Sequence, residues 1–410
     1  MLKKISTAQL QLGMFLSELC GSWMDHPFWN TRFLLEDPQD ILRIVASGVS
    51  EAWIDTSKGA DVAGGTSAAE AARQNEHDLL LATLAASNPV ARVTAASEVI
   101  KAVKICAQAR GAVVSMFQEA RMGKSVDAEA LAPLVDEISA SVTRHPGALV
   151  SLARLKSKDD YTYMHSVAVC GLMLALSRRM GLDDDTTRQA GLAGLLHDLG
   201  KAAVPLRVLN KPGKLTEVEF TEIKGHARAG YEMLLAGGGG TGAIALDVAL
   251  HHHEKVDGTG YPDRLSGEAI SRYAKMGAVC DVYDAITSNR PYKLGWNPAE
   301  ALRKMNEWAH GHFELATFHA FVKSVGIYPL GSLVRLESGL LAVVTESHDD
   351  NLLKPVVKTF YCTRRRERLH PKFVDLAQAA CADRILVWES QEKWRFPDLD
   401  QLWRVPTGGL

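Results

Sequence analysis

The sequence predicts a mainly α-helical protein with a small β-containing region at each end. Between about residues 76 and 325, Ala, Leu, Arg and Glu dominate, and apolar residues recur three and four apart, as on the buried face of a helix. Before and after this stretch, apolar residues come in short runs bounded by turn-forming residues, which favours strands. The chain has 410 residues, 47% of them hydrophobic and 23% charged, which suits two to three globular domains.

The N-terminal region predicts a small α/β or β domain. Leu12–Leu16 and Glu51–Asp55 are expected to be strands, because apolar residues alternate there between turn signals. The aromatic residues between them are more typical of a small core than of a ligand site. Residues 57–75 are rich in Gly, Ala and Ser, and we expect a mobile connection there.

The central region predicts a bundle of helices. The expected helices are 90–121, 126–144, 160–180, 184–199, 216–235, 243–252, 268–288 and 298–308. Asp183 and the two acids after it mark a helix start, because acids are favoured near the positive end of the helix dipole. The Ala-rich face of helix 90–121 fits a buried core better than the alternative, a homodimer interface.

The C-terminal region predicts a small β-rich extension. The strand-like runs are 332–336, 341–344, 354–360 and 384–388. These patterns divide the chain into an N-terminal regulatory or sensory domain at 1–130, a helical domain at 131–328 and the extension at 329–410.

Charge and cysteine usage exclude several classes of protein. The net charge is -2 and the pI about 6.7, so no basic footprint for nucleic acid is expected. The basic run Arg364–Arg368 is typical of a solvated face. The six cysteines form no Cys-x-x-Cys pair, which favours a reducing compartment without disulfides. No signal peptide follows the first charges, and the longest apolar run, Val167–Ser177, is too short to span a bilayer. We therefore expect a cytoplasmic protein without membrane insertion.

One stretch has the composition of a metal site. His251, His252 and His253 are followed by Glu254, and imidazole is the commonest metal ligand at neutral pH. The next residues, Asp257–Pro262, contain two glycines around a threonine and then a proline, which predicts a fixed turn. The stretch therefore presents metal ligands at a helix end, just before a rigid loop. A solvated polar loop is the alternative.

Four further patches on other expected helices carry ligand chemistry. They are His165, the pair His197-Asp198, His226, and the acids Asp281 and Asp284. A carboxylate has two oxygens and imidazole has no equivalent, so Asp198 is the natural bridge of a two-metal site. Each patch alone is common in proteins, but together in one bundle they suit iron, manganese or zinc in a binuclear hydrolytic centre.

A lysine shares the helix face of the His-Asp pair. Lys201 lies four residues after His197 and three after Asp198. An ammonium is costly beside bare cations, but it is favourable beside a phosphate oxygen or a leaving alkoxide. This position therefore indicates chemistry on a phosphate ester.

In this order the motifs resemble the HD-GYP family, which are bacterial cyclic di-GMP phosphodiesterases within the HD metal-hydrolase superfamily. The similar motifs are His197-Asp198-Leu199-Gly200-Lys201, His226, His252-His253-Glu254, Asp257-Gly258-Thr259-Gly260-Tyr261-Pro262 and Asp281 to Lys293 with its Arg290-Pro291-Tyr292-Lys293 end. The match covers about residues 150–320 and implies the superfamily's helical-bundle fold. The N-terminal residues Gly13-Met14, Trp23, Pro27-Phe28 and Ile54-Asp55-Thr56 resemble the uncharacterised domain that often precedes this module.

The resemblance implies a role for each motif residue. It implies metal ligands at His165, His197, Asp198, His226, His252, His253 and Asp281. It implies that Asp198 and Lys201 act in catalysis, and that Arg290, Lys293, Tyr261 and Asp284 contact the substrate. Some members carry a glutamate four residues before the first ligand histidine, which supports a third metal. Tyr161 stands there, so we expect two divalent ions, iron or manganese.

The expected function is hydrolysis of cyclic di-GMP to pGpG, to GMP, or to both. Two alternatives stay open: a phosphodiesterase for another cyclic dinucleotide such as cyclic GMP-AMP, and a catalytically weak nucleotide-binding or interaction module. The Gly260-Tyr261-Pro262 loop is the expected docking surface for a diguanylate cyclase or effector, and a homodimer is a further expected partner.

Overall fold

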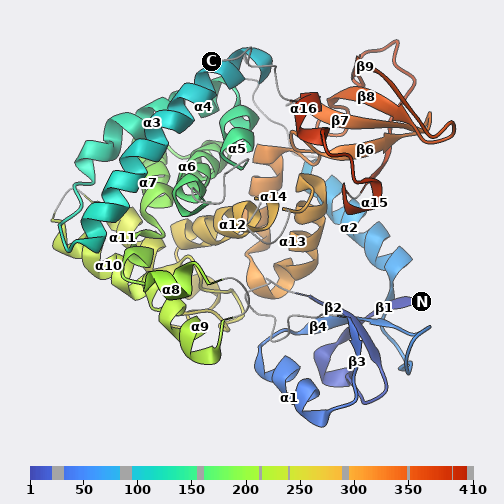
Figure 1. Cartoon of the computed structure of the whole chain (residues 1–410), viewed down its shortest axis with the longest axis horizontal. Helices are drawn as coiled ribbons and strands as arrows, with labels where there is room; N and C mark the ends of the chain where they lie inside the picture. The colour runs from blue at the N-terminus through green and yellow to red at the C-terminus, as the bar shows by residue number, and fades with distance from the viewer. Residues whose placement is uncertain are drawn as a thin grey trace. The chain divides into compact units, whose positions relative to one another are not determined.

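The computed structural model describes residues 1–20, 32–83, 95–154, 161–211, 215–238, 241–288, 295–348, 351–389 and 391–403. The chain forms two compact units, coloured along its length in Figure 1. Unit 1 comprises residues 1–81 with 303–313, and unit 2 comprises 82–302 with 314–410. The division at 130 and 328 that the sequence suggests stays a prediction.

Unit 1 is built on an antiparallel five-stranded sheet in the order β3-β2-β4-β1-β5. The strands are β1 (Leu2–Ser6), β2 (Phe15–Cys20), β3 (Phe33–Leu34), β4 (Glu51–Asp55) and β5 (Thr66–Ser67). Leu16 and Ile54 face each other across β2 and β4 and are fully buried. Helix α1 (Pro38–Ala46) adds Ile44 to the same core.

The expected connection at 57–75 is wrong over its second half. Strand β5 begins at Thr66, and helix α2 (Ala68–Thr83) follows it at once. The alanines counted as linker composition are helix formers, and Glu70 accepts hydrogen bonds from the Ser67 backbone N–H and hydroxyl at the helix start.

The second half of helix α13 (Pro298–His312) belongs to unit 1 through a buried polar network. The Asn306 amide donates to Asn75 Oδ1 of α2 at 2.7 Å, and the Asn75 amide donates to Glu307 Oε1 at 3.1 Å. Lys304 Nζ lies 2.6 Å from Glu18 Oε1 on β2. These contacts join segments more than 200 positions apart, which no local pattern could have predicted.

Unit 2 contains the expected helical bundle. Its helices are α3 (Ala95–Arg121), α4 (Ala132–Arg144), α5 (Pro146–Arg154), α6 (Tyr161–Arg179), α7 (Asp184–Leu196), α8 (Leu206–Leu209), α9 (Glu217–Lys224), α10 (His226–Ala236), α11 (Ala243–His251), α12 (Arg272–Thr287), the start of α13, and α14 (Leu315–Val325). Helix α6 packs against α5, α7, α12 and α14. The apolar run Val167–Ser177 is buried because α6 is covered on all sides. In the described part of the chain, no helix combines the length and apolar character that crossing a membrane requires.

The single helix expected at 216–235 is wrong, because two helices meet at Gly225. Thr216 caps α9 in a capping box with Glu219, and α10 begins directly at His226. The apolar periodicity continues through the break, so spacing could not reveal it. The break places His226 in the first turn of a new helix.

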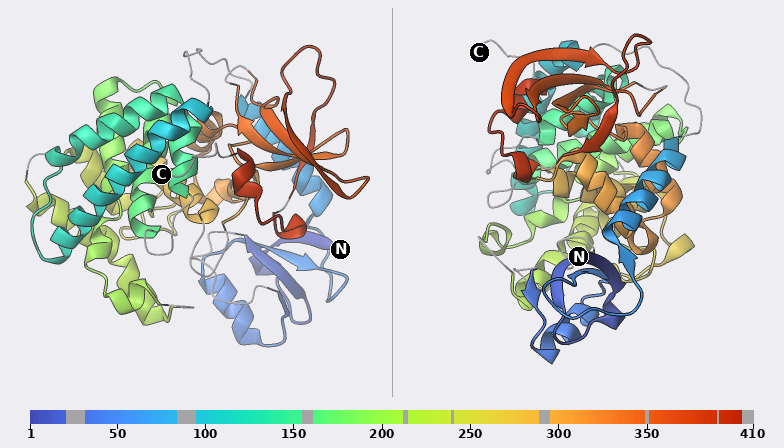
Figure 2. Two further views of the ribbon diagram at one scale, coloured as in Figure 1. Left: turned by 45° about the horizontal axis from the view of Figure 1, so that its top comes forward. Right: turned by 90° about the vertical axis from the view of Figure 1, so that its right-hand side faces the viewer.

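The C-terminal extension forms a second antiparallel sheet in the order β10-β6-β7-β8-β9 (Figure 2). Its elements are β6 (Leu333–Leu336), β7 (Leu340–Glu346), β8 (Val356–Cys362), β9 (Glu367–Asp375), β10 (Ile385–Trp388), α15 (Gln391–Trp394) and α16 (Leu399–Trp403). The four expected strands are confirmed. Strand β9 was not predicted, because most of its side chains are exposed and it lacks an apolar alternation.

Candidate metal centre

The seven side chains predicted as metal ligands converge inside unit 2. His165 lies on α6, His197 and Asp198 end α7, His226 begins α10, His252 and His253 follow α11, and Asp281 lies on α12. Five of the seven are at most 2% exposed: His165, His197, Asp198, His226 and His252. The helices therefore bring together residues that are up to 116 positions apart, as His165 and Asp281 are.

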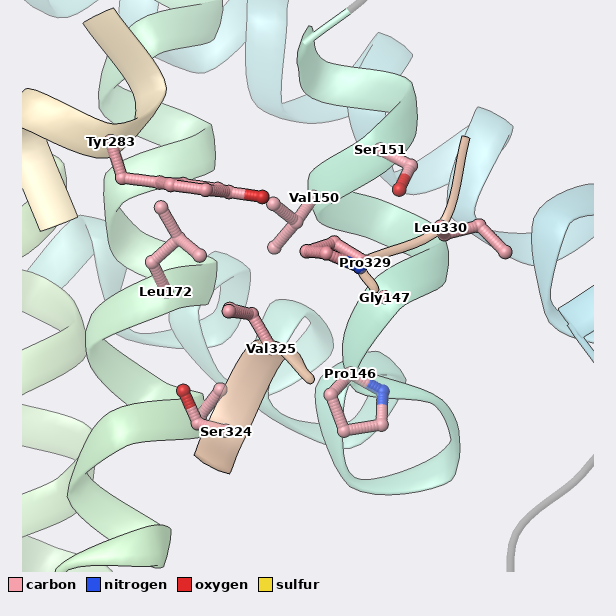
Figure 3. Close-up of a pocket in the computed structure, with 11 residues that line it drawn as sticks. Pro146, Gly147, Val150, Ser151, Leu172, Tyr283, Ser324, Val325, Pro329 and Leu330 are labelled. Atoms are coloured by element: carbon pink, nitrogen blue, oxygen red, sulfur yellow. The ribbon is translucent and has the colours of Figure 1, made fainter. Parts of the chain in front are cut away.

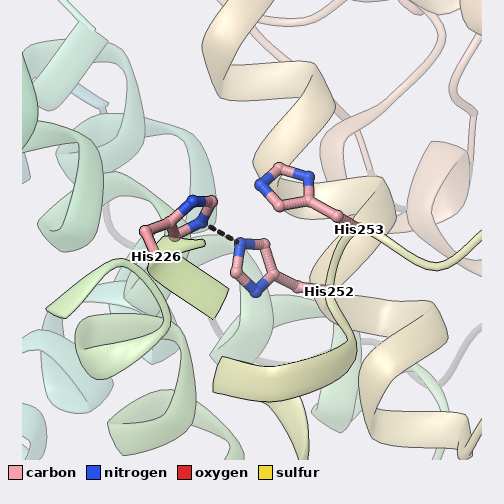
Figure 4. Close-up of side chains that lie close together, drawn as sticks. All are labelled: His226, His252 and His253. Carbon is pink, nitrogen blue, oxygen red and sulfur yellow. Dashed lines mark hydrogen bonds between the residues drawn. The ribbon is translucent and has the colours of Figure 1, made fainter. Parts of the chain in front are cut away.

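The donor atoms fall into two groups. His165, His197 and Asp198 form one, and His226, His252 and His253 form the other, with the donor atoms of each group within 4.8 Å of one another. Figure 4 shows the three rings of the second group facing one another, with Nε2 of His226 3.3 Å from Nε2 of His252. Each group has the donor types of a divalent-metal site.

Asp198, a member of the first group, also reaches the second group. Its Oδ2 atom is 3.5 Å from His165 Nε2 and 3.4 Å from His197 Nε2. Its Oδ1 atom is 3.3 Å from His226 Nε2 and 3.9 Å from His252 Nε2. One carboxylate thus presents a different oxygen to each group, which is the arrangement that a bridging ligand needs.

Asp281 also reaches both groups. Its Oδ1 atom is 2.9 Å from His165 Nε2, and its Oδ2 atom is 3.8 Å from His253 Nδ1. Two carboxylates between two sets of imidazoles balance part of the charge that divalent cations would bring.

Three of the histidines are oriented by backbone carbonyls. Nδ1 of His197 lies 2.8 Å from Gly194 O, Nδ1 of His226 lies 2.6 Å from Ile223 O, and Nδ1 of His252 lies 2.9 Å from Val248 O. A ring that donates from Nδ1 presents the lone pair of Nε2 inward, towards Asp198.

The inward atoms fit a cation. Nε2 of His197 and Oδ1 of Asp198 are buried and have no hydrogen-bond partner among the described residues. Buried polar atoms are rarely left so, and a lone pair on nitrogen beside a carboxylate oxygen is a natural ligand set for a divalent metal. The residues present are therefore compatible with divalent-metal binding.

Burial keeps two of the candidate ligand histidines neutral at pH 7. Burial lowers the pKa of His226 to about 4 and that of His252 to about 3. Burial acts to raise the pKa of Asp198, but the Lys201 ammonium and the His197 ring outweigh it and hold that pKa well below its usual range. Both kinds of ligand are thus in the form that binds metal.

The metal-free protein is expected to lose stability as the pH falls below about 6.5. His226 and His252 have folded-state pKa values below the unfolded value of 6.5, so protons bind the unfolded chain preferentially. The stability is therefore present above pH 6.5 and is lost as the pH falls towards 3. The raised pKa values of His197 and His251 oppose the effect, whereas the lowered pKa of His253 adds to it.

Denaturant unfolding of chelator-treated protein between pH 7.5 and 5 measures this loss. The double variant with asparagine at positions 226 and 252 is the control, and its profile should be flatter. A wild-type free energy of unfolding that stays constant over this range would contradict the lowered pKa values of His226 and His252.

Asp284 lies behind His165. Its Oδ2 atom is 2.6 Å from His165 Nδ1, its Oδ1 atom accepts from the Ser288 hydroxyl at 3.1 Å, and the residue is 1% exposed. The substrate contact predicted for Asp284 stays a prediction. Its position indicates that this carboxylate orients His165 towards Asp198 and Asp281.

Replacing Asp284 with alanine is expected to weaken metal binding by about 10–100-fold, the usual effect of removing a carboxylate that orients a ligand histidine. Titration of Mn²⁺ into metal-stripped protein measures the change. Alanine at the exposed Asp136 is the matched control. Equal affinities in the Asp284 variant and the wild type would show that His165 needs no such support.

The glycine of the His197–Lys201 motif is required by packing. The short 3₁₀ helix Leu199–Ala202 contacts α10 so closely that a Cβ on Gly200 would lie 1.9 Å from His226 O and 2.4 Å from Gly230 N. Only glycine permits this approach. It brings Lys201 Nζ into contact with Asp198 Oδ2 while 21% of the lysine side chain stays exposed.

The loop of residues 257–263, which we call the signature loop, packs against the second group. The Tyr261 N–H donates to His253 O at 3.2 Å, and the two rings stack with centroids 4.6 Å apart. Glu254, which was not predicted as a site residue, accepts the backbone N–H groups of Asp263 at 2.7 Å and Leu265 at 3.0 Å. In the sequence, the position of this acid directly after two candidate ligand histidines could have indicated its role, and in the structure it is buried.

Three residues on which the sequence predictions rest lie wholly or partly outside the described part of the chain. Arg290 and Lys293 lie outside the described residues, and so does the side chain of Tyr161. The predicted substrate contacts of the first two, and the two-metal argument from the third, stay predictions.

A cavity away from the ligand cluster is too small for a nucleotide. It has a volume of about 30 Å³ and is lined by Tyr283, Pro146, Leu330 and their neighbours (Figure 3). That volume admits about two water molecules.

Two family descriptions match the chain. Residues 2–131 match a domain of unknown function, DUF3391, and residues 141–316 match the HD domain. A cyclic di-GMP phosphodiesterase of Pseudomonas aeruginosa is 54% identical over 404 residues, covering 98% of this chain and 96% of the relative.

Other relatives match over shorter stretches of the chain. A cyclic di-GMP phosphodiesterase response regulator of Xanthomonas campestris pv. campestris is 46% identical over 134 residues. The match covers 33% of this chain and 35% of the relative. A 3'3'-cGAMP-specific phosphodiesterase of Vibrio cholerae is 33% identical over 170 residues, covering 41% of this chain and 39% of its own. Among solved structures, an HDG"Y"P protein of Bdellovibrio bacteriovorus has a TM-score of 0.45 and 16% identity, covering 78% of this chain and 98% of its own.

Proposed function

We propose, from the premise that this chain belongs to the HD-GYP family, that it is a metal-dependent phosphodiesterase that hydrolyses cyclic di-GMP. The main structural support for this proposal is Asp198, which presents one oxygen to each of two groups of buried histidines. A hydrolase for a doubly charged cyclic dinucleotide needs concentrated positive charge, which divalent ions held by these residues would supply, and the relative that matches nearly the whole chain is named for this substrate.

Two divalent ions, iron or manganese, are proposed as the cofactors. His165, His197 and Asp281 would hold one ion, His226, His252 and His253 would hold the other, and Asp198 would serve both. When bound, such ions polarise the phosphodiester and lower the pKa of water for hydrolysis. The ligand set of imidazole and carboxylate suits iron and manganese, and the donor groups found in the chain support it.

The chain's own residues supply binding and charge stabilisation. The Lys201 ammonium, partly exposed beside Asp198, would stabilise negative charge that develops on the phosphoryl oxygens and the leaving oxygen. Arg290 and Lys293 would hold the substrate's phosphates, and the ring of Tyr261 would line the site next to His253. The products are pGpG, GMP, or both.

Cyclic GMP-AMP is the second candidate substrate, because relatives named for it also match the chain. They are 32–34% identical, against 54% for the full-length cyclic di-GMP relative, so cyclic di-GMP is favoured. A cytoplasmic location, a homodimer, and docking of a diguanylate cyclase or effector at the Gly260–Pro262 loop complete the proposal.

Anaerobic purification, metal analysis and product separation test the function. The protein is incubated in parallel with cyclic di-GMP and 3'3'-cGAMP. Two iron or manganese ions per chain with pGpG or GMP formed from cyclic di-GMP is the expected result. Faster turnover of cGAMP would transfer the proposal to that substrate. Absence of metal and of product, even after iron or manganese is added, would favour the binding-module alternative.

A further inference from the structure

Of the three consecutive histidines, His251 is the one that is not a candidate ligand, and it lies at the centre of a chain of ion pairs. Its Nδ1 atom is 2.8 Å from Asp247 Oδ1, and its Nε2 atom is 3.2 Å from Asp263 Oδ2. The other oxygen of Asp263 accepts from Arg228 Nη2 at 2.5 Å. We call Arg228, Asp247, His251 and Asp263 the loop clamp.

The loop clamp joins two helices to the signature loop and contacts the N-terminal cap of a third. Arg228 lies on α10, Asp247 and His251 lie on α11, and Asp263 lies in the loop. The second oxygen of Asp247 accepts from the hydroxyl of Ser271, the residue that caps α12. The side chains of His251 and Asp247 are 17% and 27% exposed, so their ion pair is partly shielded from water and holds better than a fully exposed pair. The side chains of Arg228 and Asp263 are more exposed, at 45% and 37%.

Inside the loop, the anchoring continues to the ring of Tyr261. The backbone N–H of Asp263 donates to Glu254, and the N–H of Tyr261 donates to the carbonyl of His253. A Cβ on Gly260 would lie 2.5 Å from Glu254 Cα, so the loop lies directly on the chain that carries the ligands. Asp263 is two residues from Tyr261, and a displacement of one moves the other.

His253 depends on this loop more than its neighbours do. His197, His226 and His252 each have a backbone carbonyl at Nδ1. Among the described residues, the contacts of the His253 ring are instead with the rings of Tyr261, His226 and His252 and with Asp281. Stacking on Tyr261 is therefore a principal constraint on the orientation of His253.

We propose that the loop clamp is a positioning device for His253. It sets the metal affinity of the group formed by His226, His252 and His253 and leaves the group formed by His165, His197 and Asp198 unchanged. The inference rests on the metal centre of the proposed function. It makes Arg228, His251 and Asp263 positioning residues, which act on a ligand through the loop and touch no metal themselves.

Titration of Mn²⁺ into metal-stripped full-length protein, followed by calorimetry and electron paramagnetic resonance, tests the proposal without any nucleotide. The variants are His251→Gln, Asp263→Asn and Arg228→Met. Wild-type protein is expected to bind two ions. In each variant one ion should bind about tenfold more weakly, with the spin coupling between the two ions lost at limiting Mn²⁺, and the other ion should bind as in the wild type.

Two variants serve as controls. Arg228→Lys keeps the cation beside Asp263 and should restore both ions. Arg188→Met removes a partly exposed ion pair of similar exposure, Arg188 with Asp136, and should change neither ion. If His251→Gln does not fold by circular dichroism, the isosteric Asp263→Asn decides.

Two results would overturn the clamp: folded variants that bind both ions as tightly as the wild type, or variants that weaken both ions equally. Wild-type protein that binds fewer than two Mn²⁺ ions would overturn the metal centre itself, and the clamp with it. The wild-type titration therefore separates the failure of the proposed function from the failure of the clamp.

Discussion

Replacing Asp198 with asparagine is expected to abolish hydrolysis of cyclic di-GMP and the binding of both metal ions. The carboxylate presents Oδ2 to His165 and His197 and Oδ1 to His226 and His252, so both positions lose a ligand at once. The amide has one acceptor oxygen and no charge. The loss of rate should therefore exceed the roughly 10²–10³-fold typical of losing one transition-state donor.

Metal content and turnover are measured on the same preparation of the Asp198 variant. Asp198 is 1% exposed and contacts Lys201, so its replacement leaves that ammonium without its carboxylate, and thermal unfolding is recorded to separate misfolding from metal loss. Asparagine at the exposed Asp136 is the control and should change neither quantity. A folded Asp198 variant that retains two ions and turnover would remove the bridging role.

Replacing Lys201 with methionine is expected to lower kcat by about 10²–10³-fold while both metal ions stay bound. Nζ of Lys201 contacts Asp198, and 21% of the side chain is exposed, so the ammonium is placed to contact a substrate phosphate beside the metal centre. Removing a cation next to the ligands does not weaken metal binding, because it takes away a competing positive charge. Retention of metal thus distinguishes this variant from that of Asp198.

Steady-state kinetics and metal analysis check the Lys201 variant. Because the charge is needed where negative charge develops, kcat should fall more than KM rises. Lys201→Arg keeps a cation at the same position and should recover part of the rate. Turnover at the wild-type level in the methionine variant would refute the role of the ammonium.

The sequence by itself determined the class of the fold and the ligand types of the site. Helical spacing marked the bundle because one face of each helix is buried, and alternation marked strands such as β4 and β7. Histidines and acids in apolar helices, where an unpaired charge is costly, marked the candidate ligands, and the family resemblance implied the full set. Strand β9 was not predicted because most of its side chains are exposed, so its sequence shows no alternation of apolar and polar residues.

Only the tertiary structure decided how these residues are grouped. The division of the donors into two sets, with Asp198 of the first set reaching the second, follows from how α7, α10 and α11 pack. Spacing along the chain does not contain this division. The contact at Gly200 and the position of Asp284 behind His165 depend on neighbours distant in sequence. So does the use of His251, which the sequence sets beside two ligands and the fold turns towards Asp247 and Asp263. Local patterns record whether a residue is buried, but its partner is chosen by packing, which acts between segments that the chain keeps far apart.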